Sequence, residues 1–300
     1  MQQKIVPNLW CNGTAQECVD FYVSIFPESN IISTEYYPTT AEGGLADFQK
    51  NMAGQVLTIE YSLAGYECVA INAGSEFQLN PSISFMLNFD PSRDTNAEMQ
   101  LNELWQKLSV GGREHMPLDS YPFSQRYGWI EDKFGVNWQL ILTNPEGEPR
   151  PFIIPSLMFS QQQTNKAKEA IDYYTTVFQN AKLGTVAQYI QATGPAKAGA
   201  VQFADFTLAG QWFAAMDTAV EQNFTFNEAL SFAVMCKDQS EIDYFWDKLS
   251  NVPEAEQCGW CKDKYGVSWQ ITPENVNDLL RKPGAFANMM RMKKLVIADF

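Results

Sequence analysis

The stretch GWIEDKFGVNWQ at 128–139 returns as GWCKDKYGVSWQ at 259–270, with eight of twelve positions identical. Shorter strings repeat in the same order on either side: IVPNLW (5–10) as IIPSLM (153–158), YSLAG (61–65) as FTLAG (206–210), SISF (82–85) as ALSF (229–232), and LWQKLS (104–109) as FWDKLS (245–250). A period near 140 residues is too long for a solenoid repeat, so the duplicated unit is a whole domain. We therefore predict one domain over 1–146 and a second, with a C-terminal helix and tail, over 147–300. The turn-rich stretch Thr143–Pro151 would link them.

Each repeat has the pattern of a strand, a helix and three strands, taken twice. A short apolar strand over Ile5–Cys11 precedes a helix over Thr14–Phe26, which Thr14 and Glu17 would open as a capping box. Alternating apolar residues at 57, 59, 61 and 63 indicate a half-buried strand that ends in the turn Ala64-Gly65. Runs of strands with helices on one side predict an α+β fold: a curved sheet in each domain whose concave face forms a pocket.

Composition excludes several classes of function. The 300 residues carry 21 basic and 35 acidic side chains, a formal charge of −14, which disfavours nucleic acid and membrane surfaces as partners. The first residues, MQQKIVPNLW, contain no apolar signal core, so we expect a cytoplasmic protein. His115 is the only histidine, and this excludes any site built on two or three imidazoles of one chain.

Several strings resemble PhnB-like proteins of the vicinal oxygen chelate superfamily, which includes glyoxalases, bleomycin-resistance proteins and extradiol dioxygenases. These strings are DFYVSIFP (20–27), FNEALSF (226–232), FWDKLS, CGWCKDKYGVSWQI (258–271) and NMMRMKKLVIADF (288–300). The resemblance implies tandem glyoxalase-like domains, each made of paired βαβββ modules. Relatives of this type are often labelled 3-demethylubiquinone-9 3-methyltransferase, but the sequence has no glycine-rich nucleotide loop after a strand, so it does not support methyl transfer.

Metal-using members of that superfamily hold an ion with His and Glu side chains on strands of the two modules. The resemblance places the corresponding positions at six neutral residues: Asn8, Ser82, Gln139, Ser156, Ala229 and Gln270. Neutral amides and hydroxyls supply no negative charge. We therefore expect metal-free pockets without a cofactor, and we do not expect lyase, isomerase or dioxygenase chemistry that depends on a Lewis-acid ion.

Aromatic and amide residues of the repeated hairpin are candidates for ligand contact. We expect Trp129 and Trp138 to lie roughly opposite each other across the hairpin, with Trp260 and Trp269 repeating the arrangement. The rings either stack on a flat ligand or pack across the strands to hold the hairpin. Gln139 and Gln270 lie beside them and either offer an amide to a ligand or bond to the backbone.

Further candidates come from the other strands. Trp10 follows Asn8 on the first strand, and Ser231 lies in the repeated string ALSF. Asn72 and Asp217 occupy matching strand ends, and Asp217 is either a general base in a pocket or an exposed strand-end carboxylate. The predicted ligand-binding set is Asn8, Trp10, Asn72, Ser82, Trp138, Gln139, Ser156, Asp217, Ser231, Trp269 and Gln270.

Cys258 and Cys261 form a CxxC motif, but it lies in a predicted strand, where residues three apart point to opposite faces. A redox motif favours a helix start, and a zinc site needs a second pair. We therefore interpret both cysteines as structural.

Three hypotheses follow. The first is a metal-free protein that binds a small, partly apolar or aromatic molecule, either as a monomer with an internal pseudo-dimer or as a homodimer. The second is a metal-dependent lyase, isomerase or dioxygenase with an atypical site. The third is that one or both domains are structural, with side chains filling the pocket.

Overall fold

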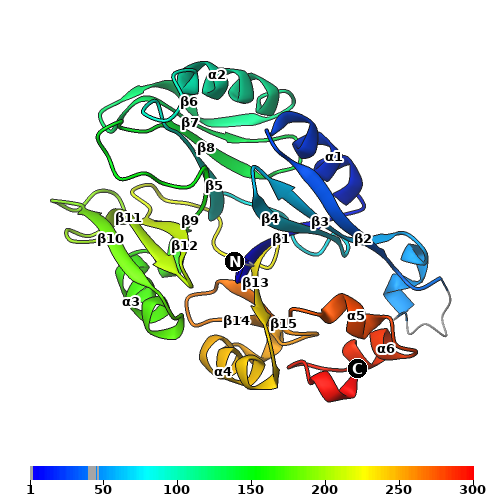
Figure 1. The fold of residues 1–300 in the computed structure, drawn as a ribbon. Coiled ribbons are helices and arrows are strands. Elements are labelled where there is room, and N and C mark those ends of the chain that lie inside the picture. The colour runs from blue at the N-terminus through cyan, green and yellow to red at the C-terminus, as the bar shows by residue number, and fades with distance from the viewer. Residues whose placement is uncertain (1–2, 40–44, 46) are drawn as a thin grey trace. The chain divides into compact units, whose positions relative to one another are not determined.

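The computed structural model describes residues 3–39, 45 and 47–300, and they form two compact units. Unit 1 consists of Met1–Gln78 and Asn227–Phe300, and unit 2 is the continuous stretch Leu79–Phe226. Each unit therefore combines one half of the first sequence repeat with one half of the second. Each has a single curved, unclosed sheet (Figure 1).

The sheet of unit 1 has the strand order β14-β15-β13-β1-β4-β3-β2. The N-terminal module contains β1 (Ile5–Cys11), α1 (Ala15–Ile25), β2 (Asn30–Tyr36), the 3-10 helix η2 (Asp47–Met52), β3 (Val56–Leu63) and β4 (Tyr66–Asn72). The C-terminal module contains β13 (Leu230–Cys236), α4 (Gln239–Leu249), η4 (Pro253–Ala255), β14 (Trp260–Lys262) and β15 (Ser268–Pro273). The short helices α5 (Val276–Leu280), α6 (Ala285–Met289) and η5 (Ile297–Asp299) follow.

The sheet of unit 2 has the strand order β10-β11-β12-β9-β5-β8-β7-β6. Its first module contains β5 (Ile83–Phe89), α2 (Ala97–Leu108), β6 (Arg113–Tyr121), β7 (Ser124–Glu131) and β8 (Asn137–Leu142). Its second contains β9 (Ile153–Phe159), η3 (Gln161–Gln163), α3 (Ala167–Val177), β10 (Lys182–Gln188), β11 (Val201–Leu208) and β12 (Gln211–Asp217).

The predicted α+β class and the paired βαβββ modules are confirmed, but the compact units do not follow the boundary at 146/147. The stretch Thr143–Pro151 lies within unit 2, where it joins β8 to β9. The reason is the pairing of first strands. In unit 2, β5 pairs antiparallel with β9, and in unit 1, β1 pairs antiparallel with β13. Sequence similarity shows which modules are equivalent, but it does not show which two modules pair to form one sheet.

The last module also has one strand fewer than the predicted three after its helix. The connection that contains β6 in the first repeat runs over 110–127, whereas its counterpart runs only over 251–258 and forms η4. The shorter connection leaves no room for a counterpart of β6 beside β14.

One turn with the same bonding closes both repeated hairpins. Asp132 Oδ1 accepts from Phe134 N and Val136 N at 2.8 and 3.1 Å, and its Oδ2 accepts from Trp138 Nε1 at 2.8 Å. Asp263 makes the same three bonds to Tyr265 N, Val267 N and Trp269 Nε1. Both aspartates are buried. The residues that are identical in the two copies of the string thus form the turn and bind the N–H group of a buried indole.

Within the described residues, no helix is long and apolar enough to cross a membrane.

We predict that Asp132→Ala and Asp263→Ala each lower the free energy of unfolding by about 3 kcal/mol, because each leaves a buried indole N–H and two backbone N–H groups without an acceptor. Urea denaturation followed by circular dichroism measures this. The exposed Asp247→Ala on α4 is the control and should change stability by less than about 0.5 kcal/mol. Equal effects for all three variants would contradict the role of the turn.

Candidate functional site

The two faces of each sheet differ in character. Helices α1 and α4 cover one face in unit 1, and α2 and α3 cover one face in unit 2 (Figure 1). The opposite face, here called the inner face, carries Asn8 and Ser231 in unit 1 and Ser84 and Ser156 in unit 2, because these residues pair across the two first strands. The inner face is the candidate functional site, since most of the predicted ligand-binding residues lie there.

A polar cluster occupies the centre of the inner face of unit 1. Asn8 is the register partner of Ser231, and Gln270 Nε2 donates to Ser231 Oγ at 2.8 Å. Asn8 Oδ1 and Ser268 Oγ are buried, and neither has a hydrogen-bond partner among the residues that the structure describes. Such oxygens cost free energy unless a donor reaches them, so this cluster has unused capacity to accept hydrogen bonds.

Aromatic rings border this cluster. Trp10 lies two residues after Asn8 on β1 and makes edge contacts with Trp260 and Phe77, at ring-centroid distances of 5.7 and 5.0 Å. Its Nε1 donates to Gly74 O at 2.9 Å, which fixes the ring. Trp260 is the register partner of Gln270. Both indoles are partly exposed, so each retains ring surface for contact with another group.

Unit 2 has the same polar positions, but its own side chains satisfy more of them. Gln139 Nε2 donates to Ser84 Oγ at 2.8 Å, and the Tyr127 hydroxyl donates to Gln139 Oε1 at 2.7 Å. Burial raises the pKa of Tyr127, so its hydroxyl stays protonated as a donor. Ser156 Oγ, at the position equivalent to Asn8, is buried without a partner in the described chain.

Larger residues fill the inner face of unit 2. Met86 stands where unit 1 has Ala233, and Tyr127 where unit 1 has Cys258. Met86 packs with Ile154 and Ala214. A second cluster joins Tyr127, Trp129 and Met158, packed against Met116, Tyr121, Ile141, Met216 and Phe224. The two inner faces therefore share a polar frame and differ in the residues beside it, which are Met86 and Tyr127 in unit 2 and Ala233 and Cys258 in unit 1.

Trp138 and Trp269 lie on the opposite face, beneath the helices. Trp129 pairs with Gln139, whereas Trp138 pairs with Ile130, so the two tryptophans are offset by one position and do not face the same side of the sheet. Side chains alternate between the two faces of a strand, and the two tryptophans therefore lie on opposite faces of the sheet. Trp138 and Trp269 are 2% and 1% exposed, and their indole N–H groups bond to the turn aspartates.

The side chains of Asn72 and Asp217 cap the N-termini of helices α1 and α3. Asn72 Oδ1 accepts from Ala15 N at 3.0 Å, and Asp217 Oδ1 accepts from Ala167 N at 3.2 Å. Asp217 Oδ2 also accepts from Val201 N at 2.9 Å. Asp217 is completely buried, so the interpretation of this residue as an exposed carboxylate at the end of a strand is wrong. The predicted capping box is also wrong, because Thr14 makes no side-chain cap bond and a strand residue caps α1 instead.

Ser82 precedes β5 and is buried, with its backbone N–H bonded to Asn80 Oδ1. The sequence-based list thus brings Asn8, Trp10, Ser231 and Gln270 together in unit 1, and Ser82, Gln139 and Ser156 together in unit 2. It does not include Ser84 and Ser268, nor Trp260, which was considered only as one of the hairpin rings. The alignment of SISF with ALSF contained the signal for Ser84, because it matches Ser84, not Ser82, to Ser231.

The inner faces do not fit a divalent metal held by His and Glu. The atoms at their centres that could bind a metal are amide and hydroxyl oxygens. In unit 1 the Gln270 amide already donates from its Nε2 to Ser231 Oγ. Across residues 3–39, 45 and 47–300, no three His, Cys, Asp or Glu side chains lie together in a way that would hold an ion. Divalent metal sites are built mainly from anionic or imidazole ligands.

The prediction that both CxxC cysteines lie in one strand is wrong for Cys258. Cys261 is buried in β14, whereas Cys258 precedes that strand with φ of 51° and contacts Met290 at 3.8 Å between sulfur atoms. His115 is on β6, half-buried beside Trp129 at a ring-centroid distance of 5.7 Å. Burial lowers the pKa of His115.

A family model described as 3-demethylubiquinone-9 3-methyltransferase matches the chain at residues 3–141 and 151–272, once for each repeat. A PhnB protein from Bacillus cereus is 33% identical over 47% of this chain and 100% of its own, with a TM-score of 0.40. Glyoxalase I from Zea mays is 11% identical over 91% of this chain and 93% of its own, with a TM-score of 0.52, which is a likeness of fold. No curated protein matches the chain.

We predict that Asp217→Asn gains stability relative to the natural protein as pH rises. Burial raises the pKa of Asp217, partly offset by its backbone hydrogen bonds, so the folded state favours the protonated form. The stability that this shift contributes is full below the ordinary Asp pKa and is lost as pH rises through the raised value. Asparagine does not ionise and can adopt the bonding of Asn72.

Urea unfolding of both proteins between pH 3 and pH 7 measures the difference. The free energy of unfolding of Asp217→Asn minus that of the natural protein should increase with pH. A difference that stays constant over this range would contradict the raised pKa.

Proposed function

The chain belongs to the family described as 3-demethylubiquinone-9 3-methyltransferase, and we propose that it binds a small, partly aromatic molecule on the inner face of unit 1 without a metal ion. The observation that carries this proposal is the pair of buried oxygens, Asn8 Oδ1 and Ser268 Oγ, which lack partners in the described chain. They lie on the same face as the partly exposed indoles of Trp10 and Trp260.

The chemistry of the face defines the ligand class. Asn8 Oδ1 only accepts hydrogen bonds, and a serine hydroxyl does either, so the ligand needs an N–H or O–H group. The edge contact between Trp10 and Trp260 leaves ring surface for a flat, apolar body. Small-molecule sites typically combine such walls with a few fixed polar groups. Phenols and aromatic amides meet both requirements.

Methyl transfer is not part of the proposal, although the family description names it. A methyl donor with a nucleoside part is usually held by backbone N–H groups of a glycine-rich loop at a helix start. Here Asn72 and Asp217 already cap α1 and α3. The free thiols of all six cysteines support the cytoplasmic location that we propose, since a reducing compartment keeps thiols in this state.

Unit 2 supports a second role, that of a structural domain. Its inner face is packed by the Met86 and Tyr127 clusters, and Gln139 is bonded at both ends of its amide. A well-packed face contributes stability rather than binding. We propose that after duplication unit 1 kept the ligand site and unit 2 filled its own.

We predict that benzamide binds to unit 1 and that N,N-dimethylbenzamide, which lacks the N–H donor, binds about tenfold more weakly. Ala233→Met should abolish binding, because methionine at this position would cover the face as Met86 does in unit 2. Met86→Ala is the matched control and should leave the affinity unchanged. Titration followed by the indole N–H signals of Trp10 and Trp260 measures binding.

Two results would contradict the proposal. One is full affinity in Ala233→Met. The other is the absence of binding by both benzamide and catechol at millimolar concentration.

A further inference from the structure

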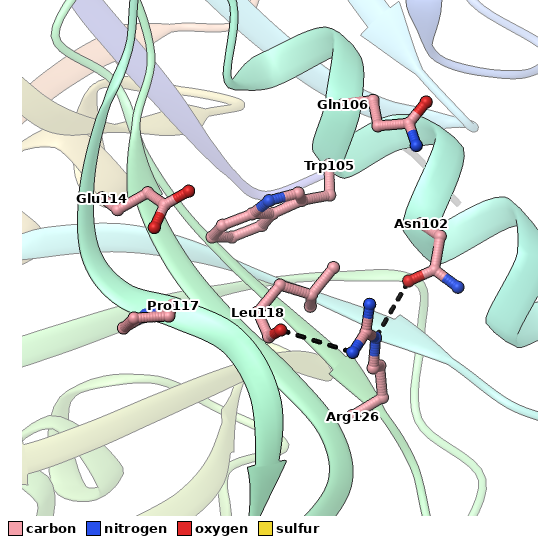
Figure 2. Close-up of a pocket in the computed structure, with 7 residues that line it drawn as sticks. All are labelled: Asn102, Trp105, Gln106, Glu114, Pro117, Leu118 and Arg126. Atoms are coloured by element: carbon pink, nitrogen blue, oxygen red, sulfur yellow. Dashed lines mark hydrogen bonds between the residues drawn. The ribbon is translucent and has the colours of Figure 1, made fainter.

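A pocket of about 490 Å³ lies in unit 2 on the helix-covered side of the sheet, away from the inner face. Helix α2 contributes Asn102, Trp105 and Gln106, strand β6 contributes Glu114, Pro117 and Leu118, and β7 contributes Arg126 (Figure 2). Its size is within the range of pockets that bind small molecules. The predicted site residues do not include any of its lining, so the pocket is independent of the proposed function.

At one end of the pocket, hydrogen bonds hold the guanidinium group of Arg126 in place. Arg126 Nε donates to Asn102 Oδ1 at 2.9 Å, and Nη1 donates to Leu118 O at 3.3 Å. These bonds fix the guanidinium plane, while Nη2 makes no hydrogen bond to the residues that the structure describes. A guanidinium fixed in this way is suited to bind a carboxylate, because the side chain loses less conformational entropy when the ligand binds.

A carboxylate lies at the other end. Glu114 is exposed, and its side chain makes no hydrogen bond or ion pair within the described part of the chain. Figure 2 shows the Trp105 indole and Leu118 between Glu114 and Arg126. Two opposite charges that line one pocket without forming a direct ion pair leave room for a ligand that meets both.

The position of the Trp105 ring depends on a close approach of the backbone. A Cβ added to Gly128 on β7 would lie 2.5 Å from Trp105 Cζ3, so only glycine lets the indole approach the strand this closely. Trp105 is 7% exposed, and the part of its ring that lines the pocket lies between the two charged side chains (Figure 2).

We propose that this pocket binds a small zwitterion, an amino acid with an apolar side chain. The ligand carboxylate pairs with Arg126, its ammonium group pairs with Glu114, and its apolar side chain lies against Trp105 and Leu118. An anion without an ammonium group would leave Glu114 unpaired, and a cation without a carboxylate would leave Arg126 unpaired. The charge pattern of the pocket therefore matches neither of these alone.

The test uses L-phenylalanine, N-acetyl-L-phenylalanine and L-phenylalaninamide with the full chain. Titrations followed by the Trp105 indole N–H signal should give the highest affinity for L-phenylalanine. Loss of the carboxylate in the amide should weaken binding about tenfold, and loss of the ammonium in the acetyl compound about threefold, because Glu114 is exposed to solvent. Equal affinities for all three compounds, or no shift of the Trp105 signal, would overturn the proposal.

Two variants assign the charges. Arg126→Gln should weaken L-phenylalanine and the acetyl compound and leave the amide unchanged, whereas Glu114→Gln should weaken L-phenylalanine and the amide and leave the acetyl compound unchanged. Lys107→Gln and Glu103→Gln, exposed on α2 outside the lining, are matched controls that should change nothing.

Arg126 also holds Asn102 and Leu118, so circular dichroism checks that its variant folds. If that variant does not fold, the comparison of the three ligands on the natural chain still decides the question. Ala233→Met should leave L-phenylalanine binding intact, which separates this pocket from the inner face of unit 1. Loss of binding in Ala233→Met would overturn the assignment to this pocket.

Discussion

The antiparallel pairing of first strands is the constraint on which the rest of the structure depends. In a single module the first strand pairs on one side only, as β1 does with β4, and its other edge would carry unpaired backbone groups. Strands β5 and β9 are buried along their whole length, and such strands need partners on both sides. The β1–β13 and β5–β9 pairs supply them. The same pairs bring Asn8 beside Ser231 and Ser84 beside Ser156, so the seam between modules is also the polar centre of each inner face.

Much of this fold could be predicted from the sequence because its signals are local. The repeated hairpin, the apolar periodicity of α1 and the alternation along β3 are encoded within a few residues. Which modules pair is not local, since β1 meets a strand more than two hundred positions away. The loss of a counterpart to β6 was visible in the shorter connection at 251–258, but a length difference alone does not say which element disappears.

The candidate site was predictable to the same degree. The resemblance to the superfamily indicated Asn8 and Gln270, because metal-binding positions of its members map onto them, and the repeated string ALSF indicated Ser231. Trp138 and Trp269 were misplaced because a large aromatic residue next to a candidate amide suggests a ligand contact, while its parity assigns it to the core. Asn72 and Asp217 were misread because their bonding partners, Ala15 and Ala167, lie about fifty residues or more away in sequence. Only the folded chain shows that a strand end caps a helix.

The division of the chain between the units has a consequence for biosynthesis. Unit 2 is one uninterrupted segment, so all its residues have left the ribosome while the C-terminal module is still being translated. The module that opens the chain emerges first but must wait for β13 before its first strand is paired on both sides. During that interval one edge of β1 carries unpaired backbone N–H and C=O groups, to which other nascent chains can bind.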